Sequence, residues 1–229
     1  MFDTHTHCRH SHDSKEDPRD MIEKAISMGM DYIAFTDHFD GDLTFLPEFD
    51  YIPQIQLKRH FDEIENLQEE YRNKIYVGVG IECGYMKEAN ELYQAKLAPY
   101  STDIIINSIH TIEHEDCYLP SYFTKRAKEQ AYGAYLKAVR ESLDCPYHYD
   151  SVGHIGYVMR KSIYEDKSLE YKDFADTYEV RAGYPYRARR TDLARGGSCA
   201  RHGNVLRFRL RRHKDGRGEK AFYSRRQSI

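Results

Sequence analysis

Six histidines and one glutamate stand where short apolar segments give way to polar ones, and all seven side chains can bind a divalent metal ion. They are His5, His7, His12, His38, Glu82, His110 and His154. Imidazole and carboxylate ligands together suit Zn, Mn or Fe better than Ca or a thiolate-type site. A parallel α/β barrel gathers the carboxyl ends of its strands on one face, so this spacing predicts one polynuclear metal site.

The His5-x-His7 pair and Glu82 indicate what such a site could do. Alternate residues of an extended strand point the same way, so His5 and His7 can present two imidazoles to one cation. A carboxylate such as Glu82 can bridge two cations and reduce their mutual repulsion. Two ions about 3.5–4 Å apart can activate a water, orient a phosphate and stabilise the leaving oxygen. The pattern therefore favours metal-assisted chemistry at a phosphate.

Arg160 and Asp37 are candidate supporting residues, and each also has an ordinary interpretation. Arg160 follows His154 in the chain and could clamp a phosphate through two hydrogen bonds, or it could be a surface residue of a basic pair. Asp37 precedes His38 and could orient its ring through a hydrogen bond, or it could belong to a turn.

The other histidines of the first part of the chain lack this placement. His60 lies in a charged helical segment beside Arg59 and Asp62, so we expect it at the solvated surface. No metal role is expected for the remaining three, which are His10, His114 and His148.

Short apolar strands alternate with amphipathic helices, and these elements must position the metal-binding side chains. Strands are expected at 32–35, 75–81 and 103–108, and helices at 57–71, 87–98 and about 124–143. Another helix should begin at Asp17-Pro18 and end near Gly29, because aspartate caps a helix, proline suits its first turn and glycine its end. The alternation predicts an α/β fold with a mostly parallel sheet or barrel. The sequence has no Gly-rich phosphate loop, nucleophile elbow or dinucleotide fingerprint.

The composition is typical of a globular protein that stays out of the membrane. Hydrophobic residues make up 40% of the 229 residues, and the mean hydropathy is -0.79. No apolar run approaches the ~20 residues that a membrane span needs. The five cysteines are odd in number and widely scattered, which favours reduced thiols over a disulfide framework. We therefore expect a cytoplasmic protein with no membrane partner.

Charge divides the chain into two unlike parts. Residues 181–229 hold 15 Lys and Arg against 3 Asp and Glu, whereas the preceding residues hold 19 against 34. A basic tail can bind nucleic acid, but this one has no interleaved aromatic residues and no recognisable binding module. The acidic first part disfavours binding to a polyanion. We therefore expect no nucleic-acid partner.

The ordered motifs resemble those of the polymerase-and-histidinol-phosphatase (PHP) family of metal phosphoesterases. The resemblance covers residues 1–178 and leaves 179–229 as an aberrant basic segment. It rests on His5-Thr6-His7, Ser11-His12-Asp13, Phe35-Thr36-Asp37-His38, Gly80-Ile81-Glu82, Ser108-Ile109-His110 and Gly153-His154-Ile155. Within the family, the chain is most similar to the stand-alone histidinol-phosphatases. The resemblance implies a distorted seven-stranded (β/α) TIM-like barrel, incomplete here at its C-terminal end.

The resemblance also implies a site for up to three divalent ions, with Glu82, His110 and His154 as catalytic residues. The first ion would be held by His5, His7 and Glu82, the second by Glu82, His110 and His154, and the third by His12 and His38. Arg160 matches a residue that contacts the phosphate. The implied reaction is hydrolysis of histidinol phosphate, a small phosphomonoester of histidine biosynthesis, by a metal-activated hydroxide. The sequence says nothing about the oligomeric state.

The chain departs from the family pattern in two places. Gly156 stands where the family usually has an aspartate, and the late Gly-Ser-Asp-Ala-His motif, which supplies two further ligands, is absent. The segment 209–213 stands where that motif would fall, and whether His213 is a ligand stays open. We hypothesise a reading-frame slip that starts near Tyr186, is rescued at about His213 and is followed by an early end of the chain. Sequencing the coding DNA in all three frames tests this.

Two alternative functions follow from the same residues. One is a PHP phosphodiesterase or nuclease, which would use the same metals on nucleotides or DNA. The other is a metal-binding protein with impaired catalysis, since two expected ligands are missing.

Overall fold

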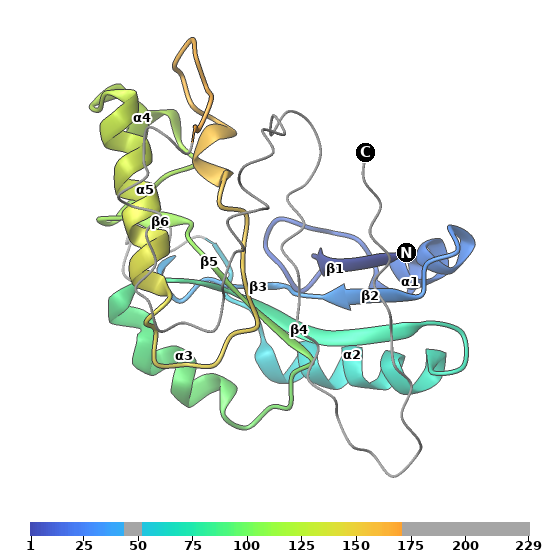
Figure 1. Ribbon diagram of the computed structural model, residues 1–229. Helices are drawn as coiled ribbons and strands as arrows, with labels where there is room; N and C mark the ends of the chain where they lie inside the picture. The colour runs from blue at the N-terminus through green and yellow to red at the C-terminus, as the bar shows by residue number, and fades with distance from the viewer. Residues whose placement is uncertain (44–51, 171–229) are drawn as a thin grey trace, which may run out of the picture.

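A parallel β-sheet with helices packed against it forms the centre of the molecule (Figure 1). The computed structural model describes residues 1–43 and 52–170. The main strand order is β1-β2-β4-β5-β8, and every pair in this sheet is parallel. The strand bounds are β1 Phe2–Thr6, β2 Tyr32–Phe35, β4 Tyr76–Gly84, β5 Ile104–Ser108 and β8 Ser151–Val152. Parallel order places the carboxyl ends of these strands along one edge of the sheet.

A short strand, β3 (His38–Phe39), joins the sheet beside the second half of β4. Its register sets His38 opposite Glu82 and Phe39 opposite Cys83. Thus β2 pairs with the first half of β4 and β3 with the second, and the register along β4 is the same for both.

The helices are α1 Pro18–Ser27, α2 Leu57–Tyr71, α3 Asn90–Leu97, α4 Pro120–Thr124 and α5 Lys128–Ser142. The first begins as the sequence predicts: the Asp17 carboxylate accepts a hydrogen bond from the Arg19 N–H, and Pro18 occupies the first turn. After this helix Gly29 adopts a positive φ of 70°, which costs glycine little. In Figure 1, α2 runs along β4 on one face of the sheet.

Two apolar clusters hold the elements together. One lies among α1, α2, α3 and the first strands of the sheet and includes the buried rings of Phe61 and Tyr93. The other joins α4 and α5 to the segment after β5 and includes Tyr132 and Tyr135. Burying a large side chain of this kind contributes roughly 1.5–3 kcal/mol. These clusters hold in place the strands and helices that carry the polar residues.

The predicted strands and helices are largely confirmed, with three differences. The strand predicted at 75–81 continues to Gly84, so Glu82 lies inside β4 and not after its end. The helix predicted from about 124 to 143 is α5, which begins only at Lys128 because the backbone of Ala127 is extended; the short α4 before it was not predicted. A hairpin of β6 (Thr111–Ile112) and β7 (Glu115–Asp116) was not predicted; Glu113 and His114, which both have positive φ, form its turn.

The parallel, curled sheet and its helices confirm the predicted α/β class. The rest of the predicted seven-stranded barrel, like the basic segment 179–229, lies outside the described residues. Within 1–43 and 52–170, none of the helices combines the length and the apolar character that crossing a bilayer requires.

Candidate metal centre

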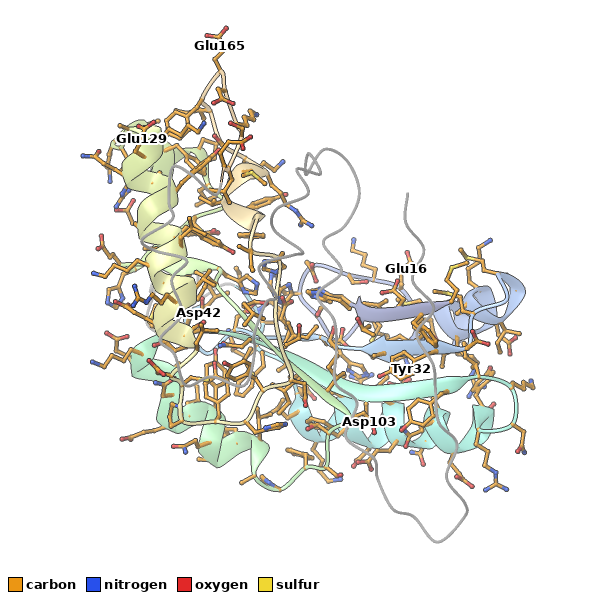
Figure 2. The ribbon with its side chains drawn as sticks, viewed as in Figure 1. Glu16, Tyr32, Asp42, Asp103, Glu129 and Glu165 are labelled. Carbon is orange, nitrogen blue, oxygen red and sulfur yellow. The ribbon has the colours of Figure 1, made fainter. Side chains whose placement is uncertain are left out.

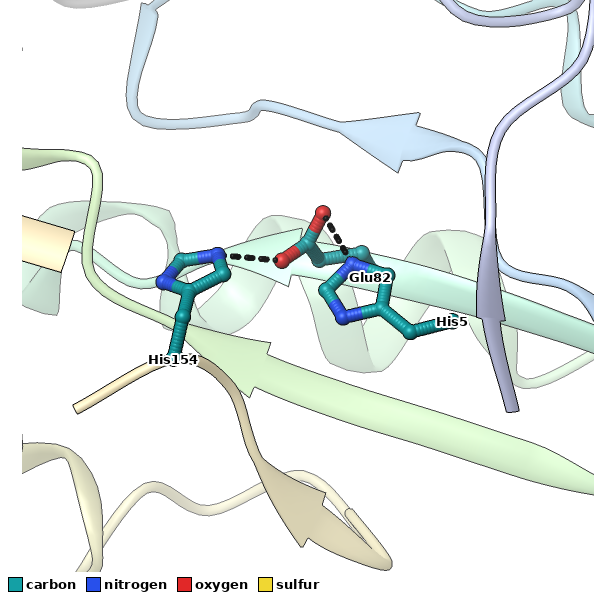
Figure 3. A group of neighbouring side chains, drawn as sticks. All are labelled: His5, Glu82 and His154. Carbon is teal, nitrogen blue, oxygen red and sulfur yellow. Dashed lines mark hydrogen bonds and ion pairs between the residues drawn. The ribbon is translucent and has the colours of Figure 1, made fainter. Parts of the chain in front are cut away.

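The carboxylate of Glu82 lies at the middle of the polar cluster and is completely buried. Its Oε1 accepts a hydrogen bond from the Ser108 hydroxyl at 2.5 Å and lies 2.9 Å from His154 Nε2. Its Oε2 lies 3.1 Å from the Nε2 atoms of both His5 and His7. Figure 3 shows the Glu82 carboxylate between the rings of His5 and His154. His5 lies on β1 and His154 follows β8, the strands at the two ends of the main strand order.

Two more of the predicted histidines reach the same carboxylate. His38 Nδ1 lies 3.3 Å from Glu82 Oε2, and His110 Nε2 lies 3.5 Å from Oε1. His12 does not contact Glu82 at these distances; its ring stacks on that of His38, with centroids 5.1 Å apart. The structure therefore brings together all seven predicted residues, with His12 at the outer side of the cluster.

A glycine lets the strand carrying His154 approach its neighbour. The Gly153 N–H donates to the Asn107 carbonyl at 2.9 Å, and a Cβ at position 153 would lie 1.9 Å from Ser108 Oγ. A side chain there would displace the Ser108 hydroxyl from Glu82. The close approach places His154 beside the same glutamate that Ser108 contacts.

Two carboxylates that the sequence did not single out, Asp40 and Asp13, complete the surroundings of the histidines. Asp40 Oδ1 lies 3.0 Å from His110 Nδ1 and 3.3 Å from His38 Nδ1, and Asp40 is buried. The oxygens of Asp13 lie 3.3 Å from His7 Nδ1. The spacing His38-x-Asp40 repeats that of His5-x-His7, so the same alternation could have identified Asp40 from the sequence.

His7 and His110 are oriented in the same way. In each ring Nδ1 faces an aspartate, Asp13 or Asp40, while Nε2 faces Glu82. Histidines that bind metals in proteins usually donate their second ring N–H to a carboxylate or carbonyl, which fixes the tautomer and leaves the other nitrogen for the metal. The arrangement therefore has the geometry of oriented metal ligands.

Unsatisfied buried atoms support the fit of the donor set to a cation. Among the described residues, three buried polar atoms that face other members of the cluster make no hydrogen bond of acceptable geometry: His38 Nδ1, Glu82 Oε2 and His110 Nε2. Leaving one such atom unsatisfied typically costs about 1–3 kcal/mol. Three groups of side chains also have ligand atoms within 4.8 Å of one another: His5–Glu82–His154, His7–Asp13–His38 and His38–Asp40–His110. Imidazole nitrogens and carboxylate oxygens mixed in this way suit Zn, Mn or Fe.

Charge within the cluster shifts the pKa values in opposite directions. Burial alone would raise the pKa of Glu82, but interactions with His110, His154 and His5 outweigh it and hold that pKa well below its usual value. Burial would lower the pKa of His38, but the charges of Asp40, Asp13 and Glu82 raise it to about 10. Histidines and carboxylates thus neutralise one another at the cluster.

Asp42 is the exception among the buried acids. Burial first, and then the charge of Asp40, raise the pKa of the Asp42 carboxyl to about 7, although Thr111 donates a hydrogen bond to it at 2.8 Å. A Cβ at Gly84 would lie 2.5 Å from Asp42 Oδ1 and 2.8 Å from Asp40 Oδ1, so the glycine makes room for both carboxylates. Figure 2 shows Asp42 amid packed side chains, whereas Glu165 projects from the edge of the molecule.

Arg160 lies at the border of the cluster and is exposed. It follows a 3-10 helix, Tyr157–Met159, and its guanidinium lies 5.8 Å from the centre of the Tyr157 ring. That ring in turn lies 4.7 Å from the His154 ring, centre to centre. Arg160 is therefore one aromatic side chain away from the histidines.

The expectation for His60 is wrong, and Asp37 has a different partner from the one considered. His60 is completely buried on α2, with Nδ1 3.1 Å from Asp37 Oδ2. Asp37 accepts hydrogen bonds from Cys8 instead of orienting the His38 ring. The prediction failed because the residues beside His60 are charged, although His60 belongs to the buried stripe of α2 that continues one turn later at Ile64.

The fold and the cluster together define a class: a parallel α/β protein with a buried histidine–carboxylate centre at the carboxyl ends of its strands. The PHP domain family has a sequence model that matches residues 3–183. The chain belongs to the PHP domain family.

Relatives with known descriptions agree with this membership. The histidinol-phosphatase of Lactococcus lactis subsp. lactis (strain IL1403) is 33% identical over 184 residues, which are 78% of this chain and 64% of that protein. The crystal structure of the histidinol phosphate phosphatase from the same organism, complexed with Zn, L-histidinol and phosphate, superposes with a TM-score of 0.70 at 30% identity. The superposition covers 77% of this chain and 65% of that one.

A second crystal structure shows the fold alone. It is that of a candidate histidinol phosphatase from Listeria monocytogenes, with a TM-score of 0.58, 20% identity and coverage of 69% of this chain and 68% of that one. The chain spans somewhat less than two thirds of the length of the Lactococcus protein.

Proposed function

We propose that this chain is a metal-dependent phosphomonoesterase that hydrolyses histidinol phosphate to histidinol and phosphate, in histidine biosynthesis. The observation that carries the proposal is the buried Glu82 carboxylate, which has five histidines within 3.5 Å of it, on parallel strands or just after them. The Lactococcus structure, at 30% identity, holds Zn, L-histidinol and phosphate. Its contents support the same substrate and the same kind of ion here.

The proposed ligands are Glu82, the five histidines around it, and His12, whose ring stacks on that of His38. We assign one ion to His5, His7 and Glu82, a second to Glu82, His110 and His154, and a third to His12 and His38. When bound, divalent ions would supply a water of lowered pKa and stabilise the charge of the phosphate. The protein orients the ligands: Asp13 holds the ring of His7 and Asp40 that of His110, each through Nδ1.

Arg160 is the proposed contact for the phosphate. A guanidinium can donate two parallel hydrogen bonds to phosphate oxygens, and its charge offsets theirs. Its contact with the Tyr157 ring, which lies beside His154, keeps it near the cluster. We assign it to substrate binding and not to the metals.

We assign the activity to one domain of residues 1–178 and leave 179–229 without a role. The family match over 3–183 supports this division. The segment 209–213, His213 and the proposed frame slip lie outside the described residues. The chain lacks the late motif that supplies two further ligands in the family. The frame-restored version therefore tests whether catalysis requires them.

The proposed location is the cytoplasm, and the proposed partner is a small phosphate ester. Four cysteines in the described residues, Cys8, Cys83, Cys117 and Cys145, are free thiols, which supports a reducing compartment. The acidic balance of the first 180 residues argues against a nucleic acid.

A substrate comparison tests the proposal. Zinc-loaded or manganese-loaded chain is assayed with histidinol phosphate and with a dinucleotide, beside a version with the reading frame restored. We expect phosphate release from histidinol phosphate and none from the dinucleotide. Preference for the dinucleotide would favour a phosphodiesterase. Stoichiometric metal without any hydrolysis would favour a metal-binding protein with impaired catalysis.

A further inference from the structure

A second polar group lies next to the residues that carry the metal centre and is buried as completely as Glu82. Its members are Cys8, Asp37, His60 and the carbonyl of Gly80, and we call them the Asp37 clamp. The three side chains are each 0% exposed. Buried polar groups cost free energy unless they are paired. Here Asp37 accepts from Cys8 and His60 Nε2 donates to Gly80, whereas His60 Nδ1 lies near Asp37 without a hydrogen bond of acceptable geometry.

The Asp37 carboxylate joins the ends of two strands. Its Oδ1 accepts the backbone N–H of Cys8 at 2.7 Å, and its Oδ2 accepts the Cys8 thiol at 3.1 Å. Cys8 directly follows His7, and Asp37 directly precedes His38. The carboxylate therefore ties together the backbone beside two of the proposed ligands.

His60 extends the clamp to the strand that carries Glu82. Its Nδ1 lies 3.1 Å from Asp37 Oδ2, and its Nε2 donates to the Gly80 carbonyl at 2.9 Å. The Glu82 N–H donates to the Asp37 carbonyl at 3.1 Å. Both ring nitrogens of His60 face acceptors, whereas an apolar residue would suffice to complete the stripe of α2.

We propose that His60 and Asp37 are positioning residues for the metal centre, and that they act by fixing the spacing of His7, His38 and Glu82. This rests on the proposed function only in so far as those three residues bind metal. The chain carries these ligands on separate strands, so small shifts between strands change the distances between ligand atoms. Helix α2 thereby contributes to the site through His60 without contacting a ligand side chain.

Zinc affinity separates positioning from simple packing. We compare the full-length chain with His60→Ala and with Ile64→Ala, a change of a buried apolar residue one turn along α2. Both variants should lower the melting temperature. Only His60→Ala should weaken zinc binding, by about 10–100-fold, the usual cost of losing a residue that supports a ligand. His60→Gln keeps an N–H donor for Gly80 and should recover part of the affinity.

A spectroscopic readout accompanies the affinity. The visible spectrum of the cobalt-substituted protein reports the geometry around the metal, and it should change in His60→Ala and not in Ile64→Ala. Equal zinc affinity and equal spectra in the two variants would overturn the proposal. If His60→Ala does not fold, Asp37→Asn replaces it, because that change keeps the size of the side chain and removes the carboxylate oxygen Oδ2, which faces both Cys8 and His60. Unchanged zinc affinity in Asp37→Asn would then overturn the proposal as well.

The comparison also distinguishes this inference from the proposed function. A wild-type chain that binds zinc but releases no phosphate contradicts the proposed function, and the affinity ratio between variants still tests the clamp. A wild-type chain that binds no zinc contradicts both.

Discussion

At the scale of single residues, the centre is organised by carboxylates as much as by histidines. Glu82 Oε1 faces His154 and its Oε2 faces His5. Asp40 and Asp13 orient the rings of His110 and His7 through their Nδ1 atoms. The sequence predicted Glu82 and all six histidines. It did not predict Asp40, although the spacing His38-x-Asp40 matches that of His5-x-His7; the structure shows Asp40 Oδ1 at 3.3 Å from His38 Nδ1.

Asp40→Asn tests the orienting role of that carboxylate. Asparagine keeps the size and an acceptor oxygen but loses the charge that favours a proton on His110 Nδ1. We expect zinc affinity to fall by about 10–100-fold, measured by competition with a chelator. Glu165→Asn is the matched control, since Glu165 is exposed and far from the cluster. Equal affinity in the two variants would contradict the assignment.

Asp42 should give the stability of the metal-free protein a recognisable pH dependence. The pKa of its carboxyl is raised to about 7 in the fold and is about 3.9 in an unfolded chain. The stabilising effect of the bound proton is therefore complete below about pH 4 and is lost as the pH rises towards about 7. Asp42→Asn removes this loss, so its stability relative to wild type should increase between pH 4 and 7 and then stay level.

Urea unfolding in the presence of a chelator measures this difference. Subtracting wild type from Asp42→Asn at each pH cancels the titrating groups that do not interact with Asp42. A difference that is the same at pH 4 and pH 8 would show that Asp42 is not a raised acid in the fold.

At the scale of elements, the strands set which ligands meet. Apolar segments such as Tyr32–Phe35 were predictable from the sequence because they are short, buried and end in polar residues. The extension of β4 to Gly84 was not predictable, since its polar Glu82 reads as the end of a strand. The burial of His60 was also missed, because α2 presents charged residues on both sides of it. The end of β4 and the burial of His60 both depend on contacts between segments that are distant in the sequence. A local sequence pattern carries no information about those contacts.

Gly153→Ala tests whether the close approach of β8 and β5 places His154. An added Cβ would overlap Ser108 Oγ, so we expect a loss of roughly 1–3 kcal/mol in stability and weaker zinc binding. Gly156→Ala is the matched control, because its Cβ would meet only the flexible end of Met159. Metal titration with circular dichroism measures both effects. Similar zinc affinity in the two variants would show that Gly153 is not required for the geometry.

At the scale of the whole molecule, a curled parallel sheet brings together ligands that are up to 149 positions apart, from His5 to His154. The α/β class and the family were predictable, because motif order along the chain mirrors strand order. The unpredictable part lies at the C-terminal end, where the chain departs from its relatives and spans less than two thirds of the Lactococcus protein. The proposed activity of the chain rests on the seven ligands in the described residues.

Phosphate release from histidinol phosphate, measured as metal is returned to chelator-treated chain, tests the central claim most directly. We predict no turnover without metal, and turnover that rises with added zinc or manganese and saturates at a fixed stoichiometry. Glu82→Gln should lose at least about 100-fold, since we propose that two ions share this ligand. Turnover that is independent of metal, or that survives Glu82→Gln, would contradict the account.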